Sequence, residues 1–202
     1  MNPQPTAQAI EQGHGGERLP MPPLEALDAD QRAAAQALID GPRKAVYGPF
    51  VALLRTPALL DRVAQLGEAL RFGGRLEARL RELAICATAR HVGNQFEWVM
   101  HQPLAQAAGV APGALEAIRQ GARPQGLAVD ELAVHDFCVE LLAHHGVADA
   151  TYERVQVALG EPGVVELATL VGYFAMVSWV MNVARTPSRP TTGVEPLVGW
   201  PV

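Results

Sequence analysis

The chain has 202 residues, of which 49% are hydrophobic and only 5% aromatic, and its formal net charge is −5 at pH 7. This length suits one domain with a sizeable core, and the composition excludes an intrinsically disordered chain. No run of Lys and Arg exceeds two residues. We therefore expect no nucleic-acid partner, because phosphate binding needs a dense basic face.

In chain order, residues 1–23 are rich in proline, glycine and glutamine and have no apolar stretch. They predict a flexible arm and no secretory signal. Helical patterns then fill residues 24–185, which we interpret as one helical domain, and no hairpin signal interrupts them. The predicted helices span 24–39, 57–72, 76–91, 94–108, 112–120, 129–145, 151–159 and 162–184. The tail, 186–202, is proline-rich and is expected to be extended.

Two helix starts carry specific signals. Asp28 stands where it can cap the first helix, and Thr56 and Pro57 begin the second with a hydroxyl cap and a proline at the first position. Between them, residues 48–50 read as a loop that leads into an apolar stretch. The fold class predicted from these patterns is all-α.

The segment 163–184 is apolar enough, and about long enough, to cross a membrane. It contains Glu166 and Asn182, and no second such segment exists. A helix buried on all sides in a protein core is the favoured interpretation, so no membrane partner is expected. Cys86 and Cys138 form no CxxC or zinc pattern, and we expect two buried thiols in a reducing, cytoplasmic environment.

Asn94, Glu97 and His101 are spaced to share one face of a helix. Glu97 and His101, four residues apart, can form a hydrogen bond. A carboxylate beside an imidazole raises the pKa of the histidine and fixes its tautomer, as a proton-transfer residue requires. The alternative is an exposed pair of small stabilising value, which spacing alone favours.

Other histidines have simpler interpretations. His135 lies in mid-helix and is expected on the surface, and His144 at a helix end is expected to satisfy terminal carbonyls. His91 could line the same cleft as His101. A metal site built from His91, Glu97 and His101 has no recognised ligand spacing, so we expect no metal.

Three consecutive stretches carry a family resemblance: ELAICATAR at 82–90, NQFEWVMH at 94–101, and the A-x-x-x-G pattern at 105–109. In this order they resemble the carboxymuconolactone decarboxylase family, whose superfamily includes the alkylhydroperoxidase D-like proteins. The resemblance covers roughly residues 45–185. It implies an alkylhydroperoxidase D-like bundle of about six to eight helices that assembles as a homo-oligomer, a trimer or hexamer.

In the peroxidase branch of that superfamily, a glutamate and a histidine work with a CxxC pair as a proton relay. Glu82 and His101 match the relay, while Asn94 and Glu97 occupy the two cysteine positions. Cys86 cannot replace those thiols, because it lies one helical turn after Glu82 on a helix expected to be packed. Thiol peroxidase activity is therefore not expected.

The decarboxylase branch resembles this chain better, and its reaction removes CO₂ from a carboxylated muconolactone, a product of aromatic-compound degradation, without a cofactor. The resemblance implies that His101 donates the proton, oriented by Glu97 or Glu82. It implies a small anionic organic substrate. The residues expected to bind it are Asn94, Arg90, His91 and Trp98.

Two alternatives remain at this stage. The chain could be a non-catalytic oligomeric binding protein that kept the fold, or a proton-transfer enzyme of another kind, such as an isomerase or a lactone hydrolase.

Overall fold

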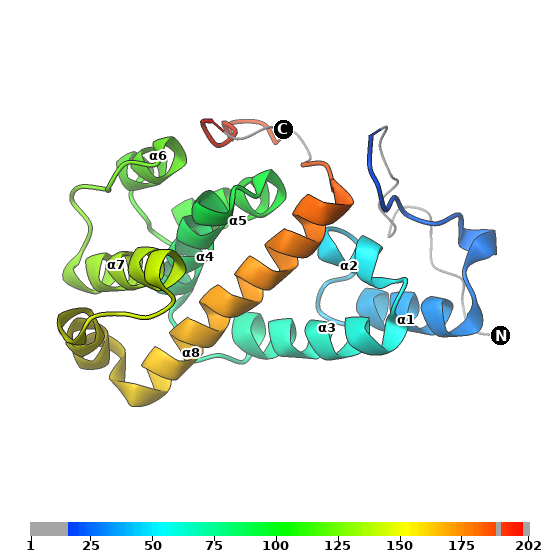
Figure 1. Cartoon of the computed structure of the whole chain (residues 1–202), viewed down its shortest axis with the longest axis horizontal. Coiled ribbons are helices and arrows are strands. Elements are labelled where there is room, and N and C mark those ends of the chain that lie inside the picture. Colours follow the sequence, from blue (N-terminus) through cyan, green and yellow to red (C-terminus); the bar gives the residue numbers. More distant parts are fainter. Residues whose placement is uncertain (1–15, 189–190, 200–202) are drawn as a thin grey trace. The chain divides into compact units, whose positions relative to one another are not determined.

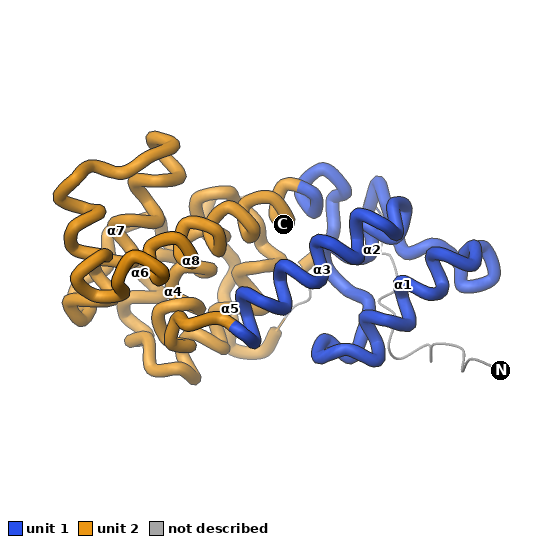
Figure 2. The backbone as a smooth tube through the Cα atoms, turned by 90° about the horizontal axis from the view of Figure 1, so that it is seen from below, with its two compact units in different colours: residues 1–73, 180–187 blue, residues 74–179, 188–202 orange. Residues whose placement is uncertain are grey.

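The computed structural model describes residues 16–188 and 191–199. Within them the chain forms eight α-helices and one short 3-10 helix and no β-strand, which confirms the all-α prediction (Figure 1). The chain divides into two compact units, 1–73 with 180–187 and 74–179 with 188–202 (Figure 2). Most of the predicted N-terminal arm, residues 1–15, lies outside the described residues.

The first unit holds η2 (Leu24–Ala26), α1 (Ala29–Asp40), α2 (Pro49–Leu53) and α3 (Pro57–Phe72), and α3 packs against both α1 and α2. The predicted cap of α1 is confirmed, because Asp28 Oδ1 accepts a hydrogen bond of 2.8 Å from the Gln31 N–H. Two local predictions are wrong. The Thr56 hydroxyl does not cap α3, because it donates to the Leu53 carbonyl instead. The expected loop at 48–50 ends early, because Pro49 is already the first residue of α2.

The second unit holds α4 (Ala78–Val92), α5 (Gln95–Ala107), α6 (Pro112–Gln120), α7 (Val129–His144) and α8 (Asp149–Ala184), whose last turn belongs to the first unit. α4 packs against α5, α6 and α7. This position explains why every residue from Leu83 to Ala89 is buried. The side chains of α4 therefore determine which side chains of the neighbouring helices can lie close to one another.

A two-residue turn, Gly93 and Asn94, connects α4 to α5. Gly93 adopts a left-handed conformation with φ 68°, which glycine tolerates best, and ends α4. Asn94 then caps α5 at once, since its Oδ1 accepts a 2.8 Å hydrogen bond from the Glu97 N–H. Glu82 lies 11 residues before Gly93 and His101 lies 8 after it, or about 16 Å and about 12 Å of helix. The turn therefore places these two residues at a similar height along the two packed helices.

α8 contains the break that the sequence predicts between residues 159 and 162. Gly160, with φ 69° and ψ 170°, is not helical, and it separates two helical segments. Among the described residues α8 is the helix whose length and composition would allow it to cross a membrane, and 56% of its most apolar window is buried inside the protein. This agrees with a core helix, but the predicted burial on all sides is wrong, because Val165 and Trp179 are 66% and 59% exposed.

The described part of the C-terminal tail is held against α5. The side-chain amide of Gln95 donates to the Leu197 carbonyl at 3.2 Å and accepts from the Leu197 N–H at 2.9 Å. The indole N–H of Trp98 donates to the Glu195 carbonyl at 2.8 Å. Leu197 is 3% exposed and joins a core cluster with Leu83 and Trp98. The tail thus completes the core of the second unit.

Candidate acid–base site

Three acid–base side chains meet between α4 and α5. His101 Nδ1 lies 2.6 Å from Glu82 Oε2, and His101 Nε2 lies 3.2 Å from Glu97 Oε2. Glu82 comes from α4 and the other two from α5. We call this set the triad. The four-residue spacing predicted the contact between Glu97 and His101. The family resemblance predicted that Glu82 belongs to the same site.

The triad is buried. The spacing of Glu97 and His101 could not distinguish a buried pair from an exposed one, and this burial does. The side chain of His101 is 4% exposed and those of Glu82 and Glu97 are each 6% exposed. The imidazole ring also contacts Phe174 of α8 edge to face, with ring centroids 5.2 Å apart and planes at 83°. An exposed ion pair on a helix surface is therefore excluded.

The pKa of His101 reflects two opposing effects. Burial lowers it, while the hydrogen bonds and charges of Glu82 and Glu97 raise it by more, so the net pKa lies above its ordinary value. In the protonated ring both nitrogens donate, one to each carboxylate. Arg81 Nε lies 3.4 Å from Glu82 Oε1. Two carboxylates thus face two cationic groups, which reduces the cost of burying the charges.

The two hydrogen bonds of His101 are unequal. The bond to Glu82 is 0.6 Å shorter than the bond to Glu97, and a short charge-assisted bond is the stronger. Glu82 therefore fixes the orientation of the ring. Nε2, with its longer contact to Glu97, is the nitrogen better able to exchange a proton with another group.

Neither cysteine offers a reactive thiol. Cys86 is fully buried, and burial together with the charges of Glu82 and Glu97 raises the pKa of its thiol well above its ordinary value. Burial likewise raises the pKa of Cys138 on α7. A thiol must ionise to attack a peroxide. In the folded chain, burial therefore keeps both thiols in the protonated form, which does not attack peroxide.

Two of the predicted substrate-binding residues make structural contacts. Asn94 caps α5 and also donates through Nδ2 to the Ser178 carbonyl at 3.3 Å. Trp98 is 1% exposed within the core cluster. Neither of them lines a large cavity in this unit, whereas the other two predicted residues, Arg90 and His91, do.

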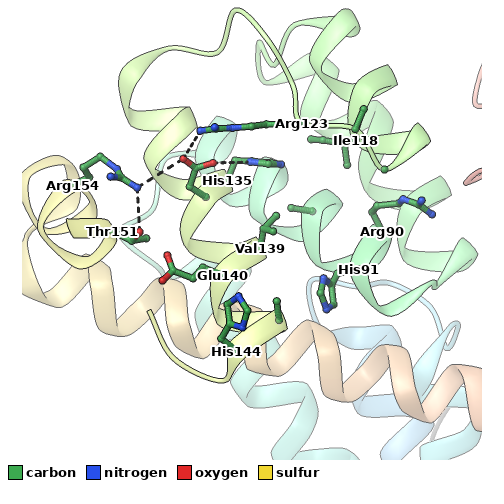
Figure 3. A pocket seen from close by; sticks show the side chains of 15 residues that line it. Arg90, His91, Ile118, Arg123, His135, Val139, Glu140, His144, Thr151 and Arg154 are labelled. Carbon is green, nitrogen blue, oxygen red and sulfur yellow. Dashed lines mark hydrogen bonds and ion pairs between the residues drawn. The ribbon is translucent and has the colours of Figure 1, made fainter. Parts of the chain in front are cut away.

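That cavity lies among α4, α6, α7 and the start of α8, and its volume is about 680 Å³ (Figure 3). We call it the α4–α7 cavity. Its charged and imidazole groups are Arg90, His91, Arg123, His135, Asp136, Glu140, His144 and Arg154. No triad residue lines it. The structure therefore separates the predicted catalytic residues from two of the predicted binding residues.

Sequence reasoning missed the α7 wall of this cavity. His135 was expected on the surface, which is wrong, because it is only 7% exposed. His144 was expected to satisfy helix-end carbonyls, yet it too lines the cavity. A signal was present in the sequence: residues 135–136, 139–140 and 143–144 recur every four positions and so share one helix face.

Within the described residues, no group of three or more His, Cys, Asp or Glu side chains is placed to hold an ion. The triad nitrogens are engaged in hydrogen bonds. Both ring nitrogens of His101 face carboxylate oxygens at hydrogen-bond distance, and a ligating nitrogen would have to give up that bond.

Residues 57–134 match the model of the carboxymuconolactone decarboxylase family. The predicted family resemblance is confirmed. All three triad residues fall inside this carboxymuconolactone decarboxylase segment. The comparison with curated proteins found no match.

Solved structures share the fold of this chain. The alkylhydroperoxidase AhpD core of a peroxidase-related protein from Ralstonia eutropha JMP134 superimposes with a TM-score of 0.71 at 20% identity, over 88% of this chain and 94% of that one. A peroxidase-related protein from Silicibacter sp. TM1040 gives 0.68 at 14% identity, over 94% and 96%. A protein of unknown function from Agrobacterium tumefaciens gives 0.60 at 13% identity, over 69% and 96%. These likenesses establish an AhpD-like helical fold.

Proposed function

We propose that this carboxymuconolactone decarboxylase-like chain is a cofactor-independent acid–base enzyme whose proton donor is His101. The observation that carries the proposal is the hydrogen bonding of both His101 nitrogens to buried carboxylates, which raises the pKa of the ring. A histidine whose pKa is raised in this way keeps its proton to a higher pH than a free imidazole and can deliver it to a substrate.

The reaction that this donor suits best is the decarboxylation of a small carboxylated lactone from aromatic-compound degradation. In that reaction the C–C bond to the carboxylate breaks, CO₂ leaves, and the electron pair flows into the conjugated lactone carbonyl to form a dienolate. His101 Nε2 then gives its proton to carbon, and a proton from water restores the imidazolium. Burial keeps the charges of the triad effective, because the local dielectric is low.

Within this scheme the two glutamates have different tasks. Glu82, with the 2.6 Å contact, orients the ring, and its other oxygen lies 3.4 Å from Arg81 Nε. Glu97, with the 3.2 Å contact, passes protons to and from Nε2. The substitution Glu97→Gln keeps the shape but removes the acid–base group. It should therefore reduce turnover by roughly 10² to 10⁴-fold.

One observation favours a second candidate, a non-catalytic binding protein of the same fold. The triad side chains are at most 6% exposed, whereas the α4–α7 cavity lies elsewhere and is lined by none of them. In that case the triad would be a buried polar network that stabilises the α4–α5 pair.

The decisive experiment measures CO₂ release and loss of lactone absorbance with a carboxylated muconolactone as substrate. We expect wild type and a surface control, Arg62→Gln, to release CO₂ and His101→Gln to be inactive while still folded. Lactone opening or isomerisation without CO₂ would assign the triad to a hydrolase or isomerase. No reaction of any of these kinds would favour the binding protein.

We further propose that the protein acts in the cytoplasm as a homo-oligomer, a trimer or hexamer, on a small anionic organic substrate. Two free, buried cysteines suit a reducing compartment. The expected partners include neither nucleic acid nor a membrane.

A further inference from the structure

The α4–α7 cavity is a concave site on the opposite side of α4 from the triad. Ala87 and His91 line it, and they follow Glu82 by five and nine residues. At about 100° per residue, this places them on roughly the opposite face of the helix. The volume of about 680 Å³ lies within the range of roughly 300–1,000 Å³ that small-molecule sites occupy.

The charged groups of the cavity leave an excess of positive charge. Arg123 Nη2 lies 2.7 Å from Asp136 Oδ2, and Arg154 Nη2 lies 3.8 Å from the same oxygen. One carboxylate thus serves two guanidinium groups, although each guanidinium has five donors. Over the whole lining three arginines face two carboxylates. This excess is notable because the chain as a whole carries a net charge of −5.

The second carboxylate is already bonded to the protein. Glu140 accepts a 2.6 Å hydrogen bond from the Ala148 N–H. The Thr151 hydroxyl, this bond and the nearby charges of His144 and Arg154 lower the pKa of the Glu140 carboxyl. Glu140 is therefore held at the loop before α8. Its charge also acts on Arg154, so it offsets part of the positive charge around Asp136.

The polar groups gather at two sides of the cavity. Figure 3 shows Arg123, His135 and Arg154 together on one side, and His91 and His144 on the other, with Val139 between them. Burial lowers the pKa of His91 and of His135. Near neutral pH these two rings are uncharged, so they can hydrogen-bond a ligand without adding charge.

Apart from Thr151, the rest of the lining is apolar. It consists of Ala87, Ile118, Ala122, Val139 and Ala143, with Gly121. Small side chains from three helices leave room for an organic ring or chain, and contact with it would remove apolar surface from water. An inorganic anion alone would leave this surface wet.

We propose that the α4–α7 cavity binds a small organic acid, with its carboxylate at Arg123 and Arg154 and its apolar body against Val139 and Ile118. The site is separate from the triad, and it does not depend on the proposed decarboxylase activity. Arginine suits this task because its planar guanidinium pairs with a carboxylate through two parallel hydrogen bonds.

The test is calorimetric titration of the full chain with three probes: sodium benzoate, benzyl alcohol and inorganic phosphate. Benzoate carries both the charge and the apolar body, benzyl alcohol only the body, and phosphate only the charge. We expect benzoate to bind with an affinity at least about tenfold above either of the others, because a charge-assisted pair and apolar burial each contribute about that factor.

Paired variants locate the binding. Arg154→Gln and Arg123→Gln should each weaken benzoate binding about tenfold, whereas Arg62→Gln on an exposed position of α3 should not. Val139→Trp fills the cavity and should abolish binding. Its control is Val157→Trp, at a position that is 88% exposed and outside the lining. Circular dichroism shows that each variant is folded.

Some results would overturn the proposal. They are no benzoate binding by the wild-type chain, phosphate binding as tightly as benzoate, or unchanged binding in Val139→Trp. Loss of benzoate binding in His101→Gln would move the site to the triad. If instead His101→Gln loses CO₂ release and still binds benzoate, the two sites are independent. If the wild-type chain binds benzoate but releases no CO₂, the proposed lyase function is wrong and the proposed organic-acid site stands.

Discussion

His101 Nδ1 lies 2.6 Å from Glu82 Oε2, although 19 positions separate the two residues in sequence. The contact joins α4 to α5 across the turn at Gly93. It is the stronger of two hydrogen bonds that raise the pKa of a ring whose burial alone would lower it. The stability of the protein and the protonation of this ring are therefore linked.

Stability should fall with rising pH because of this link. The folded pKa of His101 lies above its unfolded value of about 6.5, so the folded chain binds this proton more tightly. The resulting stabilisation is fully present below about pH 6.5 and is lost as the pH rises through the raised pKa. Urea unfolding between about pH 5 and pH 9 should show wild type losing free energy of unfolding relative to His101→Gln.

The quantity to compare is the difference in free energy of unfolding between wild type and His101→Gln, because other histidines change the stability with pH in the opposite direction. The pKa values of His91 and His135 are lowered, so their contribution to stability is lost as the pH falls. Glu82→Gln should lower the pKa of His101, which an NMR titration of the ring resonances reports. Identical pH profiles for wild type and His101→Gln would contradict the linkage.

Sequence reasoning could reach the triad only in part. The spacing of Glu97 and His101 is visible in the chain, but four-residue spacing is the same for exposed and buried pairs, so burial had to come from the structure. Glu82 lies on another helix, and no local pattern connects it to His101. The family resemblance supplied it, and the turn at Gly93 explains the contact.

The C-terminal tail shows why other features could not be predicted. Periodic apolar residues predict helical segments, but the tail has no such period. Its contacts use the backbone carbonyls of Glu195 and Leu197, which every residue possesses. Nothing in the sequence around Gln95 and Trp98 predicted that their side chains would hydrogen-bond to the tail.

Removing the side chain of Leu197 should destabilise the second unit. Leu197 is 3% exposed and packs in the core cluster with Trp98. Leu197→Ala should therefore lower the free energy of unfolding by about 2–5 kcal/mol. Val198 is 47% exposed, and Val198→Ala should change it by less than about 0.5 kcal/mol. Urea unfolding followed by tryptophan fluorescence measures both, and equal effects would show that the tail does not support the core.

Both thiols should resist modification in the folded protein. Cys86 and Cys138 are completely buried, and burial is the main cause that raises the pKa of each thiol. A disulfide reagent at about pH 8 should label them only as fast as the chain unfolds, and in denaturant it should label both at once. Peroxide should not be consumed by the wild-type chain. Rapid labelling of one thiol under native conditions would reopen the peroxidase interpretation.

Self-association should depend on an exposed face of α8. Within the second unit Val165 and Trp179 are 66% and 59% exposed, and Thr169 and Gly172 are exposed between them. These positions follow one another at intervals of four, three and seven residues and carry no charge, a pattern typical of paired helices. We therefore expect a second copy of the chain to cover this face. Trp179→Glu should convert the wild-type oligomer to single chains of 21.6 kDa.

Light scattering after size-exclusion chromatography tests this expectation at micromolar concentration. The matched control is Val157→Glu, because Val157 is 88% exposed and lies on α8 before the break at Gly160. It places the same charge on the same helix but off the proposed face, so it should leave the oligomer intact. Dissociation by both variants would indicate a general effect of added charge. A wild-type mass of one chain would show that the exposed face has no partner copy.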